Sequence, residues 1–160
     1  MEKIRDLEYQ FKDTIEEHLI DALPHIDIEK LFISSNYEDT KLSFDLVFDV
    51  KLKISVRIRK AKYIDFNDIT IRSKSKKNNK TEIHKLMEGK GQYYYYAFMN
   101  RTETDICKAY IIDIDTIRLL TEKGLYKTTS NKDNTAFNSY KLSDLRDFNG
   151  IRYSYDYSFF

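Results

Sequence analysis

The stretch LSFDLVFDVKLKISVRIR, residues 42–59, decides the fold class of this chain. Every even-numbered position in it is apolar, and every odd-numbered position except Val47 is polar or charged. Successive side chains of a strand point to opposite faces, so this alternation predicts β-structure with one buried face. Because the stretch is longer than a usual strand, we expect either a hairpin that turns near Asp49 to Lys53 or one long, bent strand.

Patterns in the rest of the chain predict helices and strands around this region. They indicate, in order, an amphipathic helix over residues 3–23 that ends at Pro24, a strand over 68–74, a polar loop over 73–80, a helix capped by Thr81, a helical segment over 93–99, a strand buried on both faces over 106–114, a short helix over 115–120 and a late strand over 153–159. We therefore predict an α/β fold with a mixed central sheet, an N-terminal helix, an antiparallel hairpin, a further helix and a buried strand.

Composition and charge narrow the class of protein. Of 160 residues, 41% are hydrophobic and 14% aromatic, and we expect residues 1–160 to form a single domain. The formal net charge is +1, so any charged binding surface has to be local. One cysteine, Cys107, excludes an intramolecular disulfide and a cysteine-rich zinc site. With no apolar segment typical of a signal peptide or a membrane span, we expect a cytoplasmic protein with no membrane partner.

Charged side chains gather on the polar face of the 42–59 region. Asp45, Asp49, Lys51, Arg57 and Arg59 share one parity and therefore one side of the predicted sheet. One interpretation is a solvent-facing surface, where charged residues are common. The other is a site that acts on a phosphodiester.

The second interpretation rests on Asp49 and Lys51, which place a carboxylate and an ammonium group side by side. A second carboxylate, from Asp45 or Asp39, would complete a cage for Mg²⁺, which prefers oxygen ligands and keeps several waters. Such an ion lowers the pKa of a bound water and neutralises phosphodiester charge, while the lysine orients the nucleophile or stabilises the transition state. We predict Asp45 and Asp49 as metal ligands, and both with Lys51 as catalytic residues.

The order of helix, hairpin with an acidic residue and Asp-x-Lys, helix and buried strand resembles the PD-(D/E)XK nuclease-like superfamily over residues 3 to about 120. The resemblance implies a restriction-endonuclease-like fold, a DNA substrate and Mg²⁺-dependent hydrolysis. It implies these motif positions: Asp39 or Asp45, Asp49 and Lys51, joined in some sites by a glutamate of the first helix, Glu8 or Glu16.

The sequence departs from the family pattern at two points. Its one proline is Pro24, so there is no Pro-Asp pair, and the gap from Asp45 to Asp49 is unusually short. If residues 53–60 and 68–74 are instead the core strands, the motif positions hold Arg57, Arg59, Thr70 and Arg72. That arrangement would bind without cleaving.

A second group of candidates lies on the predicted helix after Thr81. In the nuclease-like fold this helix often supplies polar groups near the site, and Glu82 and Lys85 would do so. Alternatively, they form an ordinary intrahelical ion pair worth a few tenths of a kcal/mol. One or two of the tyrosines at 93–96 would reach the surface and stack on a base.

A local basic patch supplies the candidates for contacts with nucleic acid. Its members are Arg57, Arg59, Arg72, Lys74, Lys76 and Lys77, of which we assign the first four to phosphate contacts. The leading hypothesis is a DNA-acting protein encoded by a phage or mobile element and, if active, a Mg²⁺-dependent endonuclease; whether it forms a homodimer is left open. The alternatives are a non-catalytic nucleic-acid-binding module on the same scaffold and a small protein-interaction protein of phage origin, such as an inhibitor of a host enzyme.

Overall fold

The computed structural model describes residues 10–23, 31–33, 46–48, 52–77, 79–89 and 91–157, with backbone alone at 31–33, 46–48 and Leu52. The elements, in chain order, are α2 (Lys12–Ala22), β1 (Leu31–Ile33), β2 (Leu46–Phe48), β3 (Leu52–Arg59), the 3-10 helix η2 (Ala61–Tyr63), β4 (Asp68–Lys74), α3 (Glu82–Met87), β5 (Tyr93–Met99), β6 (Ile106–Asp113), α4 (Ile114–Glu122), β7 (Lys127–Ser130), β8 (Ala136–Lys141), α5 (Leu142–Asp147) and β9 (Ile151–Asp156).

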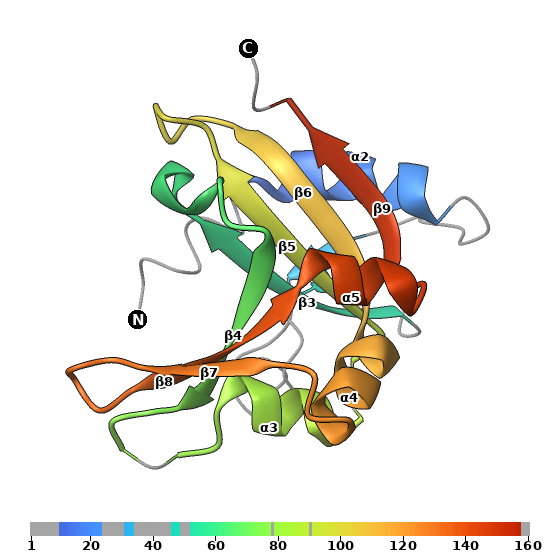
Figure 1. Cartoon of the computed structure of the whole chain (residues 1–160). Helices are drawn as coiled ribbons and strands as arrows, with labels where there is room; N and C mark the ends of the chain where they lie inside the picture. Colours follow the sequence, from blue (N-terminus) through green and yellow to red (C-terminus); the bar gives the residue numbers. More distant parts are fainter. Residues whose placement is uncertain are drawn as a thin grey trace.

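Two sheets organise these elements. The first has the order β1-β2-β3-β5-β6-β9 and is antiparallel except where β3 pairs with β5. The second has the antiparallel order β4-β8-β7. Figure 1 shows α2 behind the first sheet, with the second sheet and α3, α4 and α5 on its other side. None of the described helices is long and apolar enough to cross a lipid bilayer.

The predicted hairpin in the 42–59 region is confirmed. Strands β2 and β3 pair in antiparallel fashion, with Leu46 opposite Ile54 and Phe48 opposite Leu52. Positions 49–51 stand between the paired residues and lie outside the described part of the chain.

The two faces of strand β3 differ: one packs into a hydrophobic cluster and the other faces the second sheet. Its even-numbered Ile54 and Val56 are buried with α2 in one hydrophobic cluster. Its odd-numbered Ser55, Arg57 and Arg59 point to the opposite side, where β4 and β8 lie across from them. The polar face of this strand is therefore partly covered by the second sheet.

Residues 93–99 form strand β5, and the helix predicted there is wrong. The strand lies between β3 and β6 with both faces buried, so it lacks the alternation that marks a half-exposed strand. Tyrosine and phenylalanine also favour strands. Gly91 precedes β5 at a point of close approach, since a Cβ atom there would lie 2.7 Å from Cδ1 of Ile114.

Three consecutive tyrosines of β5 reach three different elements through their hydroxyl groups. The pairs are Tyr94 with Glu82 of α3 (2.5 Å), Tyr95 with Nδ1 of His18 of α2 (2.8 Å) and Tyr96 with Oγ1 of Thr70 of β4 (3.2 Å). A buried hydroxyl without a partner costs about 1–3 kcal/mol. The pairs therefore help to fix both layers around β5.

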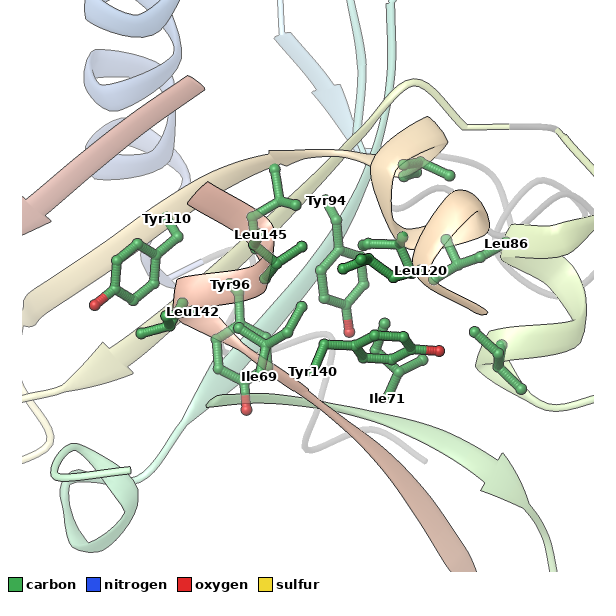
Figure 2. Close-up of a cluster of buried hydrophobic side chains, with 14 of the residues drawn as sticks. Ile69, Ile71, Leu86, Tyr94, Tyr96, Tyr110, Leu120, Tyr140, Leu142 and Leu145 are labelled. Carbon is green, nitrogen blue, oxygen red and sulfur yellow. The ribbon is translucent and has the colours of Figure 1, made fainter. Parts of the chain in front are cut away.

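A second hydrophobic cluster fills the space between the two sheets. Figure 2 shows Tyr94 and Tyr96 of β5 among side chains of β4, α4, β8 and α5, including Ile69, Leu120 and Tyr140. This cluster contains β8 and α5, neither of which the sequence patterns predicted. The predicted α/β class, with its mixed sheet, N-terminal helix, hairpin, helix and buried strand, is confirmed.

Candidate functional site

A groove of about 930 Å³ opens between the two sheets. Strand β3 lines one side, strands β4, β7 and β8 line the other, and residues at η2 and α3 complete it. Six of the lining residues are Arg or Lys and two are Asp or Glu. The volume is at the upper end of the roughly 300–1,000 Å³ typical of ligand sites.

Glu82, the first residue of α3, joins three strands around the groove. Its Oε2 accepts hydrogen bonds from Nη1 of Arg57 on β3, at 2.8 Å, and from the backbone N–H of Arg72 on β4, at 3.1 Å. Its Oε1 accepts from the hydroxyl of Tyr94 on β5, at 2.5 Å. The side chains of Arg57 and Glu82 are only 18% and 21% exposed. This carboxylate is thus a structural junction.

The charges and burial around Glu82 determine the protonation states of Arg57 and Tyr94. Burial, the largest single influence, would lower the pKa of Arg57, but the charge and hydrogen bond of Glu82 together with Tyr94 and Tyr96 outweigh it, so the pKa of Arg57 is raised. Burial, followed by the charge of Glu82, raises the pKa of Tyr94 well above its ordinary value. Arg57 therefore stays cationic, and Tyr94 stays a neutral donor.

The arginines of the groove stack on aromatic rings. The guanidinium carbon of Arg59 lies 4.2 Å from the ring centre of Tyr63, and those of Arg57 and Arg72 lie 5.5 and 5.8 Å from that of Phe137. Such stacking positions a guanidinium while leaving its N–H edge able to bind an anion. Among the described residues, Arg59 has no hydrogen-bond or ion-pair partner, and Nε of both Arg57 and Arg59 is a buried donor without an acceptor.

The structure brings most of the described candidates together. The predicted residues that line the groove are Arg57, Arg59, Thr70, Arg72, Glu82 and Lys85. Lys74 lies outside the lining and donates to Oδ1 of Asn134 at 2.9 Å. Glu16 belongs to α2, on the opposite face of the first sheet. The candidates outside the described residues are Glu8, Asp39, Asp45, Asp49 and Lys51.

The described residues do not fit a magnesium ion. They contain no group of three or more His, Cys, Asp or Glu side chains that could hold a metal. Glu82 is the groove carboxylate nearest the arginines, but its two oxygens already accept from three donors, one of them a cation. The predicted metal ligands Asp45 and Asp49 lie outside the described residues.

Three aromatic residues of the groove were not predicted from the sequence. Tyr63 and Phe66 follow β3 around η2, and Phe137 belongs to β8. A sequence signal existed for the first two, because they come soon after Arg59 in a polar segment. Phe137 reaches the groove through the pairing of β8 with β4, which no local pattern reveals.

Comparison with solved structures finds a partial likeness to a viral protein. No protein-family model and no curated protein matches the chain. A solved structure of a nuclease from a fusselovirus is similar to it. The two are 15% identical, with a TM-score of 0.40, and the match covers 92% of this chain and 90% of the nuclease.

Proposed function

We propose that this chain binds nucleic acid through the groove between its two sheets. The supporting observation is the gathering of Arg57, Arg59 and Arg72 in one concave site of a chain whose net charge is only +1. A local surplus of cations is the electrostatic footprint of a protein that binds a polyanion.

The chemistry of these arginines suits phosphate. A guanidinium has five N–H donors in a planar fork, which matches two oxygens of a phosphate group. Aromatic stacking orients the guanidinium groups of Arg59 and Arg72, so less conformational entropy is lost when they bind. Arg57 donates one hydrogen bond to Glu82 through Nη1, and its buried Nε is a donor that a bound anion or water would satisfy.

The test measures binding of labelled DNA by fluorescence anisotropy between about 50 and 200 mM salt. We expect Arg59→Ala and Arg72→Ala each to weaken binding and to reduce the slope of log affinity against log salt by about one. Arg146→Ala, an exposed arginine of α5 outside the groove lining, is the matched control and should change neither. No measurable affinity for nucleic acid at low salt would overturn the proposal.

A second candidate is Mg²⁺-dependent endonuclease activity, with Asp45, Asp49 and Lys51 as catalytic residues. The pairing of β2 with β3 favours this activity. Asp49 and Lys51 lie between the two strands in sequence, and residues of β3 line the groove. The test is cleavage of plasmid and single-stranded DNA with Mg²⁺, Mn²⁺ or EDTA. Metal-dependent cutting that disappears in Asp49→Ala, but not in the exposed control Asp65→Ala, would support it. Absence of cutting with either metal would refute it for these substrates.

A further inference from the structure

An aromatic pair stands beside the arginines at one end of the groove lining. Tyr63 ends η2 directly after β3, and its ring centre lies 6.3 Å from that of Phe66, with the rings inclined at 34°. The guanidinium group of Arg59 also stacks on the ring of Tyr63. A cationic group and two rings therefore form one continuous part of the lining.

Phe66 is unusually exposed for a side chain with no polar atom. Its exposed fraction is 57%, whereas the described phenylalanines at positions 11 and 98 are almost fully buried. Single exposed apolar residues are common on surfaces, but this one lines a cavity rich in arginine. An aromatic face that a base can cover, next to a donor for its phosphate, is the arrangement of single-strand-binding sites.

We propose that the groove takes single-stranded nucleic acid, with a base stacked on Phe66 and an adjoining phosphate bound by Arg59. The inference rests on the proposed nucleic-acid binding and adds which form of the polymer is bound. Arg72, whose guanidinium lies over Phe137, would bind a further phosphate along the strand.

The shape of the groove favours a single strand over a duplex. Proteins read duplex DNA by inserting a protruding helix or strand pair into a groove about 12 Å wide, whereas these side chains line a concavity. Arg57, with 18% of its side chain exposed, lies too deep for a phosphate on the convex surface of a duplex. The bases of a duplex also stack on one another, so their faces are not available to Phe66. A single strand can present both phosphates and base faces.

The experiment compares a labelled single strand of roughly 12 nucleotides, within the usual range of site sizes, with a duplex of the same sequence. We expect the wild-type chain to bind the strand more tightly, and Phe66→Ala to weaken that binding by about fivefold or more. Phe66→Tyr, which keeps the ring, should retain the affinity. Phe148→Ala removes another exposed phenylalanine, outside the groove lining, and should have no effect. Because Phe66 is exposed, thermal melting should show that all variants stay folded.

The outcomes separate this inference from the proposed function. If the duplex binds as tightly as the strand, or Phe66→Ala leaves strand binding unchanged, the single-strand inference is overturned while nucleic-acid binding stands. If neither polymer binds, the proposed function itself fails. Strands of DNA and RNA tested in parallel identify the preferred sugar, and preference for either supports the inference.

Discussion

Replacing Glu82 with alanine removes the acceptor that three donors share. The variant leaves Arg57 as a largely buried cation without its partner and leaves the fully buried hydroxyl of Tyr94 without an acceptor. Removing one member of a buried ion pair costs about 3–5 kcal/mol, and an unsatisfied buried hydroxyl about 1–3 kcal/mol. The two costs overlap at one site and some solvent reaches Arg57, so we expect a total loss of about 3–5 kcal/mol.

Glu82→Gln separates charge from hydrogen bonding. The amide oxygen can accept from Arg57 and from the backbone of Arg72, and the amide nitrogen can donate to Tyr94. The hydrogen bonds are then kept while the charge is lost, and we expect a smaller cost of about 1–2 kcal/mol. Glu88→Ala, at the C-cap of the same helix, is the matched control, because its ion pair with Lys80 is exposed and worth less than about 1 kcal/mol.

Urea denaturation followed by far-UV circular dichroism measures these differences. With a slope of about 2 kcal/mol per molar urea, Glu82→Ala should lower the midpoint by about 1.5–2.5 M. Glu82→Gln should fall between this variant and the control. A midpoint for Glu82→Ala within the range of Glu88→Ala would refute the conclusion that Glu82 is a structural junction.

Three further predictions concern packing and pH. Gly150→Ala should lower the melting temperature, because the added Cβ would lie 2.5–2.8 Å from three atoms of Thr116, and such overpacking costs about 1–3 kcal/mol; an unchanged melting temperature would contradict this packing. Burial lowers the pKa of His18 below its ordinary value of 6.5, so the folded chain binds this proton less tightly than the unfolded chain does. Its contribution to the free energy of unfolding should be constant above about pH 7.5 and should fall as the pH drops through 6.5. Melting curves of the wild type and His18→Gln between about pH 7.5 and 5.5 test this, and an equal pH dependence in both would disprove it. Tyr95→Phe should cost about 1 kcal/mol in urea denaturation, because it removes the hydrogen-bond partner of His18; no measurable loss would show that this contact does not contribute to stability.

Local patterns predicted part of the fold, including the doubly buried strand β6. The alternation in residues 42–59 predicted the β2–β3 hairpin, and the proposed strand at residues 68–74 coincides with β4. Residues 93–99 were assigned wrongly because a strand buried on both faces has no period of two. Strands β7 and β8 were not predicted, because β7 has only four residues, all exposed, and the buried face of β8 includes Asn138, which interrupts its apolar alternation.

The sequence predicted only part of the candidate site, because one wall of the groove depends on strand pairing between distant residues. The parity of Arg57 and Arg59 placed them on one face, and the strand after them supplied Arg72. The surface opposite that face is formed by β4, which pairs with β8 in the second sheet and not with β3 in the first. This pairing joins residues far apart in sequence, so no local pattern in β4 predicts it. Phe137, on which Arg57 and Arg72 stack, reaches the groove through this pairing.

The parallel pairing of β3 with β5 has a consequence for how the chain folds. Ile54 of β3 pairs with Tyr93 of β5, and β4 and α3 lie between them in sequence. The chain must therefore close a long loop before this pair can form. Pairings between residues far apart in sequence slow folding into the range of milliseconds to seconds. The groove also needs β8, still later in the chain, before its second wall exists. A ribosome-bound chain that has emerged only as far as β5 therefore carries the arginines of β3 but not yet the cavity they line.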